Sequence, residues 1–122
     1  MIVAGIGCRP KVDEQSLLDL IMRVTSDRRF DRLAAPEFRK AEPAIPELAK
    51  RLNVELVWID TESLTERQVE CETHSAIAFE KPGFSSVAEA CALAGAGPKS
   101  RLIVMRQSGK DVTCALAQSV ET

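Results

Sequence analysis

The sequence begins with MIVAGIGCRP over residues 1–10, and this stretch decides the fold. Residues 2–6 form an apolar run with two isoleucines and a valine that ends at Gly7, which is typical of a buried strand. After the turn at residues 8–10, Asp13 is placed to cap a helix. Apolar residues then recur at helical spacing, at Leu17, Leu20, Ile21 and Val24. A strand, a glycine turn and an amphipathic helix in this order indicate an α/β domain.

The rest of the chain continues this alternation. We expect strands at residues 33–35, 56–59, 102–105 and 112–117, the last two joined by a turn at residues 108–111. We expect three further helices. Pro46 lies in the first turn of one, the next covers residues 61–69, and the last starts at Ser86. The pattern predicts one three-layer α/β domain over residues 1–122. Its sheet should be mixed and mostly parallel, with helices on both faces and a C-terminal β-hairpin.

The segment Ser86-Val87-Ala88-Glu89 matches a capping box. The Ser86 hydroxyl should accept a hydrogen bond from the Glu89 backbone N–H, and the Glu89 carboxylate should accept one from the Ser86 N–H. The following helix should stop at residues 95–98, which read Gly-Ala-Gly-Pro. Helix capping is therefore a sufficient explanation for Glu89.

Composition excludes several classes of protein. The chain has 122 residues, of which 45% are hydrophobic, enough for one domain with a core and too many for a disordered chain. A net charge of -2 gives no general attraction to nucleic acid or to anionic membranes, and we expect neither as a partner. No apolar run is long enough to span a membrane, and residues 1–10 do not resemble a signal peptide. We therefore expect a cytoplasmic protein.

The four cysteines are widely spaced, and none belongs to a CxxC pair. This argues against a zinc site and a thioredoxin-like motif, and we expect no metal and no cofactor. Reduced thiols packed as small apolar groups are the simplest interpretation. Cys8 is the exception, because we expect it in a glycine-bounded turn beside Arg9.

The Gly5-Ile6-Gly7 segment is partly similar to a dinucleotide-binding fingerprint, but the third glycine is missing and Pro10 stands in its place. A small anion pocket formed by the turn amides and Arg9, or a purely structural turn, remain as alternatives. His74 is the single histidine, and no GxSxG motif surrounds a serine. A solvated loop position is the simpler interpretation of His74, and spacing does not support its pairing with Cys8 as a nucleophile.

Four segments, taken in order, resemble the CobE/CbiG C-terminal domain family of cobalamin biosynthesis. They are Gly5-Ile6-Gly7-Cys8-Arg9, Lys40-Ala41-Glu42-Pro43, residues 82–90 (PGFSSVAEA) and Thr113-Cys114-Ala115-Leu116-Ala117. The resemblance extends from residue 2 to about residue 117, and the length is similar to that of the free-standing, CobE-like form. The sequence departs from the family pattern at residues 44–46 and at Arg106, where a lysine is common.

The resemblance implies a role in corrin-ring synthesis and a precorrin-type tetrapyrrole as the ligand, with other cobalamin-pathway proteins as further candidate partners. It implies ligand-binding roles for residues matching the family motifs, namely Gly5, Gly7, Cys8, Arg9, Lys40, Glu42, Ser86 and Glu89. The ligand's peripheral carboxylates would suit Arg9, Lys11, Arg39 and Lys40. An auxiliary binding protein is the first hypothesis. The alternatives are a hydrolase that opens the lactone ring of a precorrin or cobalt-precorrin, as in CbiG, and a scaffold in a biosynthetic complex. No catalytic residue is assigned.

Overall fold

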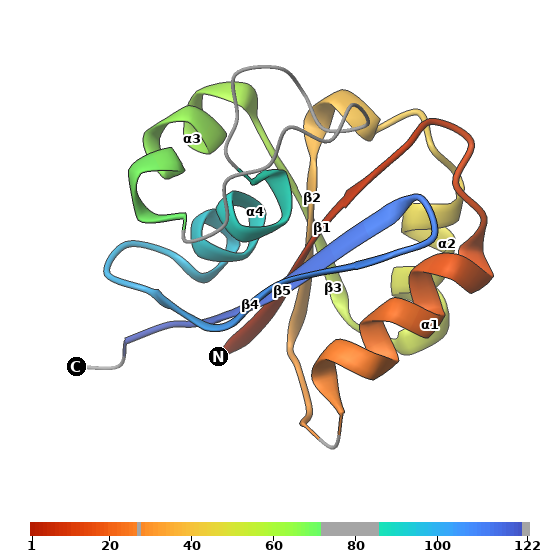
Figure 1. Cartoon of the computed structure of the whole chain (residues 1–122), viewed down its shortest axis with the longest axis horizontal. Helices are drawn as coiled ribbons and strands as arrows, with labels where there is room; N and C mark the ends of the chain where they lie inside the picture. The colour runs from red at the N-terminus through yellow and green to blue at the C-terminus, as the bar shows by residue number, and fades with distance from the viewer. Residues whose placement is uncertain (27, 72–85, 121–122) are drawn as a thin grey trace.

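The computed structural model describes residues 1–26, 28–71 and 86–120, and it contains one five-stranded sheet with helices on both faces (Figure 1). The strands are β1 Ile2–Cys8, β2 Arg32–Pro36, β3 Glu55–Ile59, β4 Arg101–Gly109 and β5 Val112–Gln118. The α-helices are α1 Glu14–Thr25, α2 Ala44–Leu52, α3 Thr61–Glu66 and α4 Val87–Ala96. Two short 3-10 turns, η1 Glu37–Arg39 and η2 Gln68–Glu70, complete the described elements.

The strand order is β3-β2-β1-β5-β4. Strand β1 pairs in parallel with β2, and β2 pairs in parallel with β3. Strand β5 lies antiparallel to both β1 and β4, so it runs against the other strands. The predicted fold class is confirmed, including the mostly parallel strand directions and the C-terminal hairpin formed by β4 and β5.

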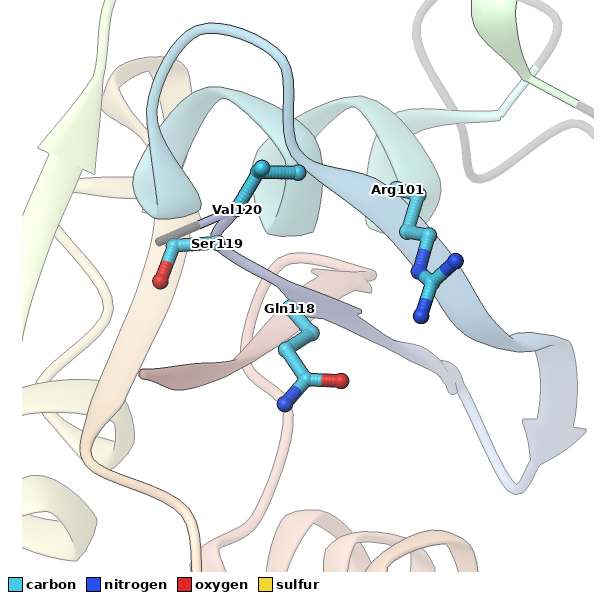
Figure 2. A pocket seen from close by; sticks show the side chains of 4 residues that line it. All are labelled: Arg101, Gln118, Ser119 and Val120. Carbon is cyan, nitrogen blue, oxygen red and sulfur yellow. The ribbon is translucent and has the colours of Figure 1, made fainter. Parts of the chain in front are cut away.

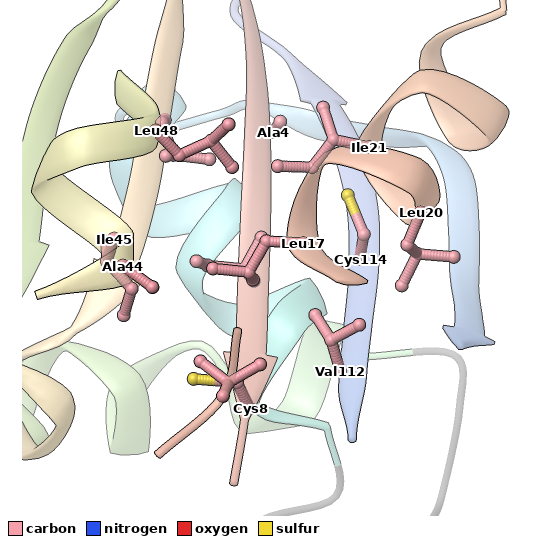
Figure 3. Close-up of a cluster of buried hydrophobic side chains, with 14 of the residues drawn as sticks. Ala4, Cys8, Leu17, Leu20, Ile21, Ala44, Ile45, Leu48, Val112 and Cys114 are labelled. Carbon is pink, nitrogen blue, oxygen red and sulfur yellow. The ribbon is translucent and has the colours of Figure 1, made fainter. Parts of the chain in front are cut away.

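The two faces of the sheet carry different helices. Helices α1 and α2 cover one face, where Leu17, Ile21 and Leu48 pack with sheet residues in the cluster of Figure 3. Helices α3 and α4 cover the other face, where Leu64 and Val87 belong to a second cluster. Three layers therefore form around the central strands, because apolar side chains project from both faces of the sheet.

Helix starts follow the sequence signals. Asp13 precedes α1 and its carboxylate accepts a hydrogen bond from the Ser16 N–H at 2.7 Å. That backbone hydrogen bond is the main reason the pKa of Asp13 lies below its ordinary value. Pro46 lies in the first turn of α2, as predicted. The helix predicted at residues 61–69 is shorter, because α3 ends at Glu66 and η2 follows it.

The predicted glycine turn after residue 6 is wrong, because β1 continues through Cys8. Strand β5 provides antiparallel partners for the last two residues, with Gly7 opposite Thr113 and Cys8 opposite Val112. Gly5 lies in mid-strand, where a Cβ would stand 2.2 Å from the Ala88 carbonyl oxygen. This glycine therefore serves the close packing of α4 on β1.

No helix within residues 1–26, 28–71 and 86–120 has the length and apolar character needed to cross a membrane.

Candidate functional site

Two loops meet at the carboxyl end of β1. The first is the turn that follows β1, and the second is the connection from β2 through η1 to α2. The Arg39 Nε–H donates to the Cys8 carbonyl at 2.7 Å, and the Lys11 N–H donates to Glu42 Oε1 at 2.5 Å. These two bonds join the loops, although each spans 31 positions of the sequence.

The turn after β1 is also bonded to the turn between β4 and β5. The Arg9 N–H donates to the Asp111 carbonyl at 3.0 Å, and the Arg9 Nε lies 3.4 Å from Asp111 Oδ1. The side chains are 52% and 46% exposed, so the ion pair is open to water and to competing anions. The turn is thus fixed through its backbone on both sides.

Four basic residues lie on the two loops that meet at this junction. Arg9, Lys11 and Lys40 are exposed, whereas Arg39 is partly buried with its guanidinium carbon 4.9 Å from the centre of the Phe38 ring. The carboxyl ends of parallel strands are the usual place for ligands of open α/β sheets. The arrangement can attract an anionic ligand and donate charge-assisted hydrogen bonds to it.

Helix α4 begins near the same end of β1. A Cβ on Gly7 would lie 3.4 Å from Val87 Cβ, so the first turn of α4 covers Gly7. The buried Ser86 hydroxyl accepts a hydrogen bond from the Glu89 N–H at 3.2 Å, which confirms this half of the predicted capping box. Glu89 is fully buried, and its Oε2 accepts a hydrogen bond from the Arg106 N–H at 2.9 Å. This oxygen thus joins α4 to β4, a use that the capping box does not predict.

The structure separates the predicted site residues into two groups. Arg9 and Lys40 are exposed at the junction of the loops, and Glu42 is partly exposed there. The remainder are buried in β1 or at the start of α4, namely Gly5, Gly7, Cys8, Ser86 and Glu89. Contact of the buried group with a ligand stays a prediction, and so do the roles of the exposed residues.

Cys8 does not occupy the glycine-bounded turn that the sequence predicted, because it is the last residue of β1. Its side chain is buried at the end of β1 (Figure 3), and burial is the main cause that raises the pKa of the thiol to about 11. Arg39 lowers this pKa and Glu42 raises it, both by smaller amounts. The thiol is therefore protonated at neutral pH, which makes it a poor nucleophile. All four cysteines are buried thiols.

His74 and the motif residues 82–85 lie outside the described residues, so the predictions for them stay predictions. Asp111 was missed as a site residue, since the sequence marks it only as part of a turn. Among residues 1–26, 28–71 and 86–120, no cluster of three or more His, Cys, Asp or Glu side chains could hold a metal ion.

Two of the hollows in the part of the chain that the structure describes lie away from the loop junction. The first, of about 400 Å³, is lined by Arg101, Gln118, Ser119 and Val120 (Figure 2). It lies at the end of the sheet where β1 begins, since Gln118 pairs with Ile2. The second, of about 330 Å³, lies beside α3 and the end of α4, and its lining includes Arg67 and Gly97. Neither hollow contains a site residue that the sequence predicted.

Comparisons with known proteins identify the family. The model of the family described as "Cobalamin synthesis G C-terminus" matches residues 2–117. Protein CobE from Sinorhizobium sp is 30% identical over 121 residues, covering 95% of this chain and 79% of the relative.

Solved structures agree with this assignment. The crystal structure of CobE, a protein from the cobalamin (vitamin B12) biosynthetic pathway, matches with a TM-score of 0.89 and 30% identity, covering 98% of this chain and 91% of the other. Cobalamin biosynthesis protein chiG from Agrobacterium tumefaciens str. C58 matches with a TM-score of 0.81 and 32% identity, covering 99% and 100%. A cobalamin biosynthesis protein G homolog from Sulfolobus solfataricus shares the fold, with a TM-score of 0.71 and 21% identity over 98% of this chain and 37% of that one. The chain therefore belongs to the CobE/CbiG C-terminal family of cobalamin biosynthesis proteins.

Proposed function

We propose that this chain binds a precorrin-type tetrapyrrole intermediate of corrin-ring synthesis and acts as an auxiliary binding protein. The observation that carries the proposal is that two loops bonded together at the end of β1 carry four basic residues, Arg9, Lys11, Arg39 and Lys40. Precorrins carry many peripheral carboxylates, and spaced cations suit such a ligand better than one deep pocket does. Family membership supplies the pathway.

Arg9 is the cation best placed for direct contact. It is half-exposed, and its described ionic partner Asp111 is similarly exposed, so a ligand carboxylate can replace Asp111 at small cost. A guanidinium can hold a carboxylate through two parallel hydrogen bonds, which a lysine cannot do. Arg9 would therefore contribute orientation as well as charge.

The described candidates for catalysis support binding better than lactone hydrolysis. A hydrolase needs a group that activates water beside donors that stabilise an oxyanion. The Cys8 thiol is buried and protonated, and Glu89 is buried with one oxygen bonded to Arg106. One oxygen of Glu42 accepts the Lys11 N–H. Hydrolysis and a scaffold role therefore become outcomes of the test.

The direct test is incubation of the purified protein with precorrin intermediates, followed by absorbance and by mass. We expect a shifted absorbance spectrum and an unchanged ligand mass. A new mass that appears only with protein would instead identify an enzyme. An unchanged spectrum and mass would overturn the proposal and favour the scaffold.

Arg9→Ala locates the site. Binding should weaken, with a smaller salt dependence than for the wild type and an unchanged melting temperature. Arg101→Ala is the matched control, because Arg101 is an exposed arginine in the hollow at the other end of the sheet, where β1 begins. A loss confined to Arg101→Ala would move the site to that hollow.

A further inference from the structure

Lys11 has an unusual backbone conformation. Its φ is 64°, in the left-handed region that residues with a Cβ adopt at a cost in free energy. The N–H of this same residue donates to Glu42 Oε1 at 2.5 Å. A carboxylate hydrogen bond thus lies at the most strained point of the turn after β1.

The backbone of Glu42 is held by hydrogen bonds on both sides. Its N–H donates to the Arg39 carbonyl at 3.0 Å, and its own carbonyl accepts from the Ile45 N–H, at the start of α2, at 3.3 Å. The side chain is partly buried. The backbone that carries the carboxylate is therefore fixed at the connection to α2, and the carboxylate in turn holds the turn that carries Arg9 and Lys11.

We infer that Glu42 is a positioning residue, which holds the backbone of Lys11 so that Arg9 and Lys11 face a carboxylate-bearing ligand together. This inference rests on the proposed function. It also explains why a carboxylate stands among cations at a site for an anion. By charge alone Glu42 repels such a ligand, so its benefit has to come through the turn that it holds.

The two effects of Glu42 have opposite signs, which makes the inference testable with cobyrinic acid, a stable corrin with free peripheral carboxylates. Cobinamide, whose peripheral carboxylates are amidated, is the control ligand. Glu42→Ala should weaken binding of cobyrinic acid by about tenfold, the effect of losing a hydrogen bond to a charged group. Glu42→Gln keeps an acceptor for the Lys11 N–H and removes the repelling charge, so its affinity should equal or exceed that of the wild type.

Two further variants separate positioning from other causes. Glu47→Ala removes an exposed carboxylate from the first turn of α2 and should not weaken binding. Lys11→Gly relieves the left-handed strain, because glycine adopts a positive φ freely. In the Lys11→Gly background, adding Glu42→Ala should therefore cost much less affinity than it does in the wild type. A direct contact between Glu42 and the ligand would cost the same in both backgrounds.

Hydrogen exchange gives a readout that needs no ligand. The Lys11 amide should exchange faster in Glu42→Ala than in Glu42→Gln, at equal melting temperature. Absence of binding by the wild-type chain would overturn the proposed function, and the ligand-related role of Glu42 with it. Binding that Glu42→Ala leaves unchanged or strengthens would overturn the positioning role alone, as would unchanged Lys11 exchange.

Discussion

Gly5 lies directly against the Ala88 carbonyl, so closely that a Cβ at residue 5 would stand 2.2 Å from that oxygen. The same Cβ would lie 2.3 Å from the Ala92 nitrogen. Strand β1 and helix α4 are thus packed backbone to backbone in the middle of the domain. The loop junction lies at the carboxyl end of this same strand.

Gly5→Ala should lower the free energy of unfolding by about 3 kcal/mol, because the added methyl group meets backbone atoms that cannot turn away. Urea unfolding measures the change. Gly109→Ala is the control, since its nearest new contact would be an ordinary 3.4 Å from Leu20 Cβ. Similar losses for both variants would contradict the close packing.

Ser86→Ala should cost about 1 kcal/mol of stability through the loss of the α4 cap. Glu89→Gln should cost less, because its side-chain oxygen can still accept the Arg106 N–H. Thermal and urea unfolding of both variants would test the order. If Glu89→Gln folds normally yet no longer supports cobalamin synthesis in cells, a structural role does not account for Glu89.

All four cysteines should be reduced in the native protein, since each is a buried thiol. Alkylation without reductant after denaturation should add four modifying groups, measured by intact mass. Native protein should react slowly under the same conditions, because burial raises the pKa of Cys8 and of Cys114. Two fewer modifications in the denatured sample would indicate a disulfide.

Stability should decrease at high pH, in part through Cys8. Its pKa is raised from 9.0 to about 11 by burial, so between these values the unfolded chain loses the thiol proton while the folded chain keeps it. The folded state binds more protons there, and the free energy of unfolding must fall as pH rises. Cys8→Ala should flatten this fall when unfolding is measured from pH 8 to 11. An identical pH dependence in wild type and Cys8→Ala would contradict the shift.

Asp111→Asn should strengthen binding of cobyrinic acid by about two- to fivefold, the range expected when an exposed competing ion pair is removed. Asparagine tolerates the φ of 62° at this position, and the backbone bond from Arg9 to residue 111 is kept. Asp19→Asn on α1 removes the same charge without touching Arg9 and serves as the control. Weaker binding by Asp111→Asn would show that the Arg9–Asp111 pair orients Arg9 for the ligand.

The sequence predicts the layers well because local signals and the tertiary fold agree. Asp13 and Ser86 both cap helices as expected, and the apolar spacing of α1 matches its buried face. The end of β1 could not be predicted in the same way. Gly7 and Cys8 suggest a turn locally, but β5, more than a hundred positions later, provides strand partners for both.

The sequence points to the two segments of the loop junction but not to the bonds between them. The family motifs single out Arg9, Lys40 and Glu42, and the structure brings their two segments together. The bond from Lys11 to Glu42 depends on a left-handed backbone at residue 11, which lysine does not signal. Nor does spacing predict that Glu89 bonds to Arg106 on an edge strand.

Strand β5 also has a consequence for protein engineering. It returns the chain beside β1, and just beyond it the Ser119 N–H donates to the Met1 carbonyl at 2.9 Å. This contact lies at the end of the sheet opposite the loop junction. Linking residues near these positions and reopening the chain at the exposed Asn53 would give a circular permutant that keeps every strand pair. A partner domain fused at either position would likewise leave the loop junction unobstructed.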